Sequence, residues 1–155
     1  MRKLIITSIT LCLGFTIANA QEIKEAVVPA KVKDSFAKKY PNSKAEEWIK
    51  EETNYEVEFK LNKVESSVLF TEDGVFKEVE QEIKIAELPK GVTDYCTKNY
   101  AGYKLSEAAK TTDDLGKITF EAEMEKGKEH FDVIFDDKGS FIKKEVSSTK
   151  DDGKD

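Results

Sequence analysis

Few side chains in this sequence are of a type that could carry out catalysis. His130 is the one histidine among 155 residues, so a Ser-His-Asp relay would have to be built on it. The sequence has neither a Gly-x-Ser-x-Gly turn nor a glycine-rich loop that could cradle a phosphate. One histidine and two cysteines are also too few for a His-rich or four-cysteine zinc site. We therefore expect no catalytic residue, no metal site and no cofactor.

The segment Asp136-Asp137-Lys138-Gly139 has part of the pattern of a calcium-binding loop. Lys138 stands where an oxygen ligand is needed, and no glutamate closes the loop at the required position. We interpret this segment as a hairpin turn between two strands.

Cys96 and His130 each allow two interpretations. Cys96 lies on the apolar stripe of a predicted helix, which favours a small core residue over a reactive or intermolecular thiol. His130 opens a predicted strand and alternates away from Phe131, which favours an exposed polar residue over a ligand-binding group or a pH switch.

The first twenty residues have the pattern of a secretory signal peptide. Two basic residues precede an apolar run over residues 4–17, and residues 18–20 supply the small side chains of a cleavage site. The apolar run is shorter than the roughly 20 residues that span a bilayer, so a retained anchor is the less favoured alternative. We predict cleavage after Ala20 and a periplasmic or secreted protein that starts at Gln21 and has no membrane span.

The chain expected after cleavage is acidic. The whole sequence has 25 Lys and Arg against 31 Asp and Glu, and cleavage would leave 23 against 31, a formal charge of −8. Such a chain repels phosphate backbones, and no stretch combines clustered lysines with aromatic residues, so nucleic acid is not expected as a partner. Cys96 would be the remaining cysteine, which excludes an intramolecular disulfide.

The sequence repeats itself in its second half. At an offset of sixty Val32 corresponds to Val92, and at an offset of sixty-five Gly74 corresponds to Gly139. The five extra residues fall near Asp113–Lys117. The further pairs are Tyr40 with Tyr100, Tyr55–Phe59 with Phe120–Met124, Phe70 with Phe135, Phe76 with Phe141 and Glu80 with Glu145. Asn62 and Gly127 also correspond, and both residue types tolerate the positive φ of a tight hairpin.

Each copy starts with a pattern of helical period and continues with a pattern of period two. The helices are expected after Val28-Pro29 and Leu88-Pro89 and end near Tyr40 and Tyr100. The strands are expected at 45–51, 55–61, 64–71 and 75–81, and at 104–110, 118–125, 129–135 and 140–146. Short turns between strands require antiparallel pairing. We predict a single α+β domain made of two α-β-β-β-β repeats, at about 28–83 and 88–146. The two repeats form one sheet of about eight strands, with the helices on one face and solvent on the other. A disordered tail is expected at 147–155.

The repeat unit resembles the PepSY-like family, whose members are also described as similar to the fold of a β-lactamase-inhibitor protein. The matching features are Val28-Pro29, Phe36 with Tyr40-Pro41, Ala45 with Trp48, Tyr55-Glu56-Val57, and Phe70 with Asp73-Gly74. In the second copy Ala108 replaces Trp48 and Cys96 replaces Phe36. The resemblance implies an exported bacterial protein in which two αβ repeats form one sheet, and it implies no established activity.

The sheet face away from the helices is the predicted binding surface. Alternation places charged side chains on that face together with a few apolar ones, and such mixed surfaces are typical of interaction sites. The predicted contact residues are Trp48, Glu56, Glu58, Leu69, Glu121, Glu123, His130 and Ile134. The alternative is an ordinary solvated acidic face.

Two functional hypotheses follow from this surface. The first is a non-catalytic binding module that engages an envelope or extracellular protein with a basic surface, with enzyme inhibition as one form. The second is an envelope protein that binds a small ligand or a cation through its clustered carboxylates.

Overall fold

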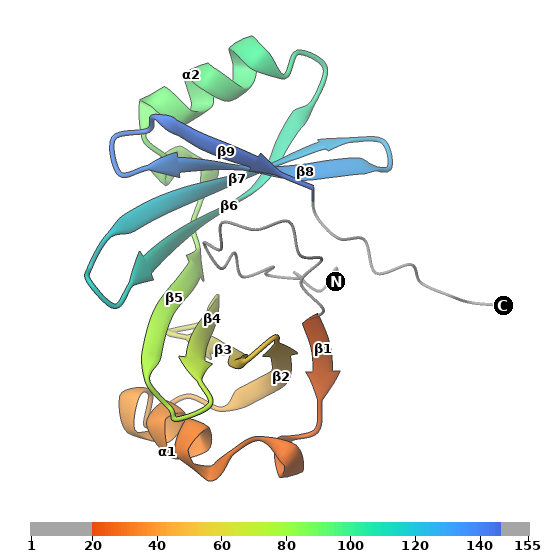
Figure 1. Cartoon of the computed structure of the whole chain (residues 1–155). Coiled ribbons are helices and arrows are strands. Elements are labelled where there is room, and N and C mark those ends of the chain that lie inside the picture. Colours follow the sequence, from red (N-terminus) through yellow and green to blue (C-terminus); the bar gives the residue numbers. More distant parts are fainter. Residues whose placement is uncertain (1–19, 147–155) are drawn as a thin grey trace, which may run out of the picture. The chain divides into compact units, whose positions relative to one another are not determined.

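The computed structural model describes residues 20–146 (Figure 1). The predicted signal peptide, apart from Ala20, and the predicted tail lie outside the described residues. Neither ten-residue helix in the described part has the length and apolar character needed to cross a membrane.

The described strands form one antiparallel sheet in which the strand order follows the sequence from β1 to β9. The strands are β1 Ala20–Ile23, β2 Ala45–Glu51, β3 Asn54–Leu61, β4 Val64–Thr71, β5 Phe76–Glu82, β6 Lys104–Asp113, β7 Ile118–Lys126, β8 Glu129–Asp136 and β9 Phe141–Glu145. The α+β class and the antiparallel sheet are confirmed. Eight strands were expected, and the ninth is β1, whose four residues carry no apolar alternation and join the edge of β2 by backbone pairing.

The chain divides into two compact units (Figure 1). Unit 1 contains the described residues up to Glu82 together with Thr111–Lys117, and unit 2 contains Ile83–Lys110 and the described residues from Ile118 onward. The helix-then-strands order of the predicted repeat recurs, with α1 at Ala30–Lys39 and α2 at Lys90–Asn99. A short 3₁₀ turn precedes each helix, η1 at Glu25–Val27 and η2 at Ile85–Glu87.

Each helix covers one face of the strands in its own unit. In unit 1 Val32 and Phe36 of α1 are buried against Val57, Phe59 and other inner residues of the strands. In unit 2 the equivalent helix positions are Val92 and Cys96, which pack in a core with residues of β6, β7 and β8. The period of two along each strand then directs the intervening side chains to the opposite, outer face.

Trp48 lies on the inner face, and its predicted outward position is wrong. Its Cα is paired with that of the core residue Val57, and its ring packs edge-on against Phe36 with centroids 5.8 Å apart. A register shift between Ala45 and Glu47 changes the alternation that the sequence pattern suggested for the start of β2. The side chain is 5% exposed, so Trp48 is a core residue of unit 1.

The turn between β4 and β5 approaches helix α1 closely at Gly74. This glycine has φ of +77°, and a Cβ built on it would lie 2.5 Å from the backbone oxygen of Lys31. Gly139 holds the equivalent turn against α2 in unit 2, with φ of +79° and a Cβ position 3.2 Å from the nitrogen of Val92. These two positions therefore need glycine both for the positive φ and for the space.

We predict that Gly74→Ala destabilises unit 1 more than Gly116→Ala does. Gly116 also has a positive φ, of +79°, but open space surrounds its Cβ position. Backbone strain alone should lower the free energy of unfolding by about 1 kcal/mol in Gly116→Ala, whereas the added clash should bring Gly74→Ala to about 2–4 kcal/mol. Urea denaturation of both variants measures the difference, and equal losses would contradict the close approach of this turn to α1.

We predict that Trp48→Ala lowers the free energy of unfolding by about 3–5 kcal/mol, as expected for removal of a large core side chain. Trp48→Phe is the matched control. The indole nitrogen of Trp48 is buried without a hydrogen-bond partner among the described residues, so phenylalanine loses no such bond and should cost under about 1.5 kcal/mol. Thermal and urea denaturation check both values, and a harmless Trp48→Ala would mean that the ring lies outside the core.

Candidate functional site

The outer face of unit 1 is built from two rows of paired residues across its strands. One row joins Ile49 of β2, Glu56 of β3, Leu69 of β4 and Glu78 of β5. The next row joins Glu47, Glu58, Ser67 and Glu80 in the same strand order. Directly paired side chains on one face lie about 4.5–5.5 Å apart at Cβ, so these carboxylates and apolar side chains form one continuous patch.

The centre of this patch is buried, although the sequence predicted a solvated face. Glu56 is 1% exposed, Leu69 is 2% exposed, and Ser67 and Glu80 are buried as well. Glu58 and Glu78 remain half-buried at the borders. Alternation fixes which side of the sheet a residue occupies, but it carries no information on what shields that side from water.

Glu56 is the most unusual group in the patch. Both of its carboxyl oxygens are buried without a hydrogen-bond partner among the described residues. Burial raises its pKa well above the usual range, and the carboxylates of Glu51, Glu80 and Glu58 raise it further. Ser67 lies near enough to lower this pKa in part, but its hydroxyl does not meet hydrogen-bond geometry with Glu56. The ionised form of Glu56 is therefore disfavoured.

Glu51, at the end of β2, lies beside Glu56. Burial raises the pKa of Glu51 to about 7, the neighbouring Glu56 carboxyl lowers it in part, and Glu78 and Glu52 raise it. Glu80 accepts a hydrogen bond from the Thr111 hydroxyl at 3.3 Å. The outer face of unit 1 thus gathers several carboxyl groups of which at least two resist ionisation.

The outer face of unit 2 repeats the geometry with a different charge pattern. Its first row pairs Glu121 of β7 with Ile134 of β8 and Lys143 of β9, and its second row pairs Glu123 with Asp132 and Glu145. At the sixty-five-residue offset Lys143 takes the place of Glu78, and Asp132 takes the place of Ser67. The ammonium group of Lys143 forms an ion pair with Glu145.

Asp132 is the buried carboxyl of unit 2. It is 4% exposed, and burial raises its pKa to about 7, with further increases from Glu123, Glu145 and Glu107. Glu123 accepts a hydrogen bond from the Ser106 hydroxyl at 2.7 Å. The carboxyl of Asp132 faces three carboxylates, so its ionised form is disfavoured.

The predicted contact residues are therefore placed unequally. Seven of the eight lie on the outer face of their own unit, and Trp48 lies in the core. Leu69, Glu56 and Ile134 are buried, whereas Glu58, Glu121, Glu123 and His130 are half-buried. His130 is paired with Glu125 at the end of β7 and is less exposed than the sequence suggested.

The sequence analysis missed Ile49, Glu51, Glu80 and Asp132 as members of these faces. For Glu80 and Asp132 the signal was present, since the repeat alignment and the alternation both place them beside predicted residues. The position of Ile49 depends on the register shift in β2, which leaves no mark in the pattern of residues. Burial of the acidic groups could not be read from the sequence.

Two other candidate groups have structural roles. Cys96 is buried, and burial raises the pKa of its thiol to about 11, which keeps it protonated and supports the core interpretation. Asp136 accepts hydrogen bonds from the backbone of Lys138 at 3.0 Å and Ser140 at 2.7 Å, so the predicted hairpin turn is confirmed. Between residues 20 and 146 no group of His, Cys, Asp and Glu is arranged to hold a metal ion.

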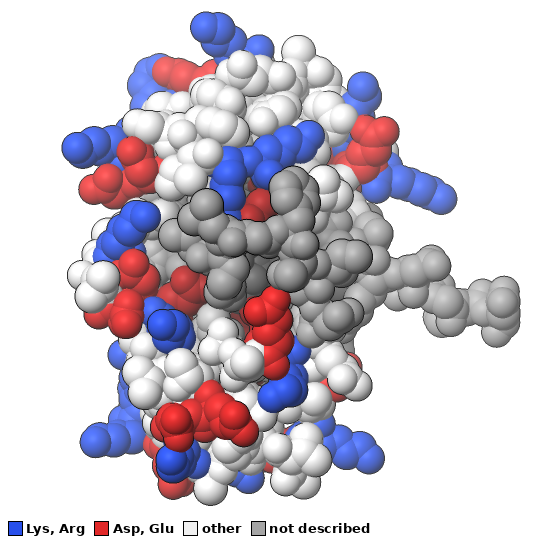
Figure 2. Space-filling model, viewed as in Figure 1, with Lys and Arg blue, Asp and Glu red and all other residues white. Residues whose placement is uncertain are grey.

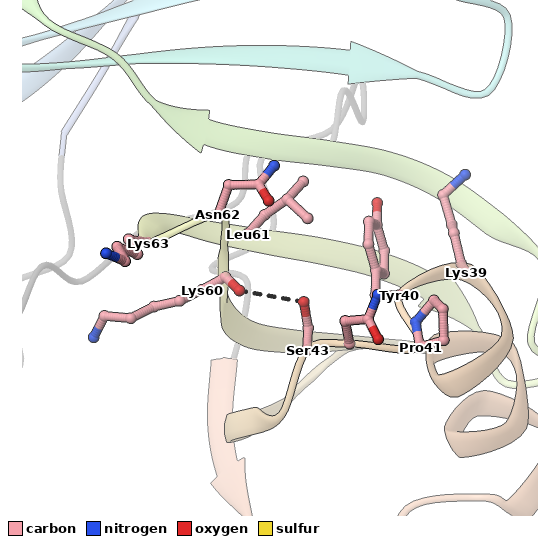
Figure 3. A pocket seen from close by; sticks show the side chains of 9 residues that line it. Lys39, Tyr40, Pro41, Ser43, Lys60, Leu61, Asn62 and Lys63 are labelled. Carbon is pink, nitrogen blue, oxygen red and sulfur yellow. Dashed lines mark hydrogen bonds between the residues drawn. The ribbon is translucent and has the colours of Figure 1, made fainter.

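A shallow hollow of unit 1 lies between the end of α1 and the β3–β4 turn (Figure 3). Two of its three lysines, Lys39 and Lys60, have partners. The Lys60 ammonium lies 2.8 Å from Glu65 and 3.4 Å from Glu46, and the Lys39 ammonium lies 3.9 Å from the centre of the Phe76 ring. Ser43 donates a hydrogen bond to the Lys60 carbonyl across the hollow.

Charge on the rest of the visible surface is mixed. Figure 2 shows lysines interspersed with aspartates and glutamates, without a continuous basic area on the described surface that faces the viewer. This pattern agrees with the overall excess of acidic residues and gives no support to a nucleic-acid site.

We predict that Glu51→Gln stabilises the protein at pH 8 and has little effect at pH 5. The folded-state pKa of Glu51 lies above its unfolded value, so the unfolded chain loses this proton first and stability falls as the pH rises from about 4.5 to about 7. Glutamine does not ionise, so this loss of stability is absent in Glu51→Gln. We expect its free energy of unfolding at pH 8 to be about 1–3 kcal/mol higher than that of the parent protein. Asp132→Asn should behave in the same way.

Glu72→Gln in the exposed β4–β5 turn is the control for this pH series. Urea unfolding at pH 5, 6.5 and 8 compares the three variants with the parent protein. A Glu51→Gln effect that stays constant across this range would contradict the raised pKa.

Comparison with known proteins identifies relatives of this chain. A family model described as "putative beta-lactamase-inhibitor-like, PepSY-like" matches residues 16–77 and 53–143. No curated protein matches the sequence.

Solved structures share the fold at low sequence identity. A DUF2874 family protein from Bacteroides uniformis has a TM-score of 0.68 and 17% identity, over 79% of this chain and 91% of that one. A Bacteroides eggerthii protein described as periplasmic has a TM-score of 0.69 and 16% identity, over 77% and 88%. A BLIP-like protein from Bacteroides fragilis has a TM-score of 0.61 and 20% identity, over 81% and 92%.

The family resemblance read from the repeat is thus confirmed. Since the two matches of the family model overlap and together run from residue 16 to residue 143, the chain belongs to the PepSY-like, beta-lactamase-inhibitor-like family.

Proposed function

We propose that the protein is an exported binding module without catalytic activity, and that it engages a periplasmic or extracellular protein with a basic surface through the outer faces of its strands. The family description and the periplasmic and BLIP-like descriptions of the structural relatives support this class of function. Inhibition of an envelope enzyme is the form of engagement that the family description suggests.

One observation carries the proposal. The Glu56 carboxyl is 1% exposed, and both of its oxygens lack a hydrogen-bond partner among the described residues. An unpaired buried polar group costs about 1–3 kcal/mol, and more when it is charged. A neutral side chain of similar size would remove that cost. The presence of Glu56 in spite of this cost indicates a role other than stabilising the fold.

The surrounding residues indicate what kind of partner fits. Ile49 and Leu69 flank Glu56 in the same row and supply apolar area, while Glu58 and Glu78 add negative charge at the borders. Apolar area beside clustered carboxylates suits lysine or arginine side chains, whose stems are apolar and whose ends are cationic. The half-buried Glu121 and Glu123 on the outer face of unit 2 also favour lysine or arginine side chains of a partner.

Affinity capture from a periplasmic extract of the source organism tests the proposal. We expect a specific protein to be retained by the unaltered bait and lost by a Glu58→Lys/Glu123→Lys bait, because these reversals repel a basic surface from each outer face. Glu72→Lys/Asp137→Lys is the matched control, since it changes the same number of charges in exposed turns. Equal recovery on all three baits would contradict binding through the outer faces.

A further inference from the structure

Ser43 in unit 1 and Tyr103 in unit 2 occupy the same place in the repeat, at the offset of sixty residues. The backbone reaches this place in the same way in both units. The nitrogen of Ser43 donates to the oxygen of Tyr40 at 3.0 Å, and the nitrogen of Tyr103 donates to the oxygen of Tyr100 at 3.1 Å. The two side chains therefore leave equivalent turns, which follow α1 and α2, and they differ by an aromatic ring.

The Tyr103 ring has a defined place in unit 2. It packs edge-on against Phe131 with centroids 5.0 Å apart, and its hydroxyl donates a hydrogen bond to Glu129 at 2.7 Å. The ammonium group of Lys126 lies 5.4 Å from the centre of the ring. Unit 2 thus fills the place beside its β7–β8 hairpin with an aromatic ring of its own.

Unit 1 has the hollow of Figure 3 at the corresponding place, between the end of α1 and the β3–β4 hairpin. Its lining includes Ser43, Tyr40 and Leu61, and Leu61 corresponds to Lys126 at the offset of sixty-five residues. In Figure 3 the Leu61 side chain and the Tyr40 ring stand on either side of the space above Ser43. The hollow has a volume of about 360 Å³, which the short Ser43 side chain does not fill.

From this comparison of the two repeats we infer that the hollow at the end of α1 is a receptor for an aromatic side chain, a phenylalanine or tyrosine of a partner protein, which takes the place that the Tyr103 ring holds in unit 2. This inference goes beyond the proposed function. The residues that line the hollow belong to neither row of the outer face of unit 1, so the hollow is a second contact surface of that unit.

The lining suits a ring that arrives on a peptide backbone. Leu61 offers an apolar side chain and Tyr40 an aromatic ring, and aromatic rings pack favourably against both. Asn62 and Lys63 are exposed at the rim and carry N–H donors for the peptide carbonyl groups on either side of the incoming residue. A blocked amino acid is therefore a better match than a free aromatic molecule.

Nα-acetyl-phenylalanine methylamide is the probe for this site. Nα-acetyl-leucine methylamide is the apolar control, and benzyl alcohol is the control with a ring and no peptide backbone. NMR titration of the purified protein should show saturable millimolar binding of the phenylalanine probe, with shifts of the Ser43 and Leu61 amide signals. Both controls should bind about threefold more weakly or worse, because one lacks the ring and the other the carbonyl groups. The amide signals of Tyr103 and Lys126 should not move, since that place is filled.

Reciprocal variants locate the site. Ser43→Tyr supplies the ring from the chain itself, so it should raise the thermal midpoint and abolish binding of the phenylalanine probe. Ser43→Ala is the matched control, because it removes the hydroxyl without adding a ring, and it should bind the probe within twofold of the parent protein. Tyr103→Ser should open an equivalent hollow in unit 2, seen as new probe-induced shifts at Lys126. Because Ser43→Tyr is expected to be more stable, its loss of binding cannot be attributed to unfolding.

Several outcomes would overturn the inference. Absence of probe-induced shifts at the hollow, equal binding of the leucine probe, or unchanged binding to Ser43→Tyr would each do so. A folded Ser43→Tyr with a lowered thermal midpoint would show that a ring does not fit there. Tighter binding of benzyl alcohol than of the phenylalanine probe would assign the hollow to a small aromatic ligand and overturn the protein partner.

The result is independent of the proposed function, because these titrations use the purified protein and a different surface. Equal recovery on all capture baits would remove binding through the outer faces and leave the aromatic site supported by its own titrations. A partner captured through the outer faces, together with no binding of the phenylalanine probe, would support the binding module and remove the aromatic site.

Discussion

The structure depends on the period of two along its strands. Because a ten-residue helix covers one face of the strands in each unit, every second side chain must be apolar there, and the side chains between are directed to the other face. Val57 and Val68 meet the helix in unit 1, whereas Glu56 and Leu69, each one residue away along the strand, cannot. The acidic outer faces are thus a direct consequence of how the inner cores are built.

The turns at Gly74 and Gly139 hold each helix in that position. Both glycines have a positive φ and lie against the first residues of a helix, so the helix and the third hairpin of each unit are fixed to each other by backbone contact. The repeat preserves this contact while allowing the core to change. Phe36 and Trp48 in unit 1 correspond to Cys96 and Ala108 in unit 2, where Tyr95, Tyr100 and Tyr103 pack around the smaller side chains.

Duplication of a unit also explains how the outer faces could diverge. A residue on the outer face is not required by the core beneath it, so exchange of Glu78 for Lys143 or of Ser67 for Asp132 leaves the fold unchanged. The electrostatic consequences are large, however, because the centre of each face is buried. In unit 2 Lys143 forms an ion pair with Glu145 while burial raises the pKa of Asp132, and in unit 1 burial and the neighbouring carboxylates raise the pKa of Glu56. Function in this family therefore need not follow from fold.

The sequence by itself determined the two helices, eight of the nine described antiparallel strands, the repeat and seven of the eight residues predicted on the outer faces, because each of these follows from local periodicity and turn chemistry. Asn62 and Gly127 were expected to take positive φ in their hairpins and do so, at +54° and +65°. Tertiary structure alone decided three matters. The register shift in β2 put Trp48 in the core, backbone pairing added β1 at the edge, and shielding from solvent turned the glutamates of an expected open face into buried acids. These depend on contacts between residues distant in sequence, and no local pattern records which side chains such contacts shield from water.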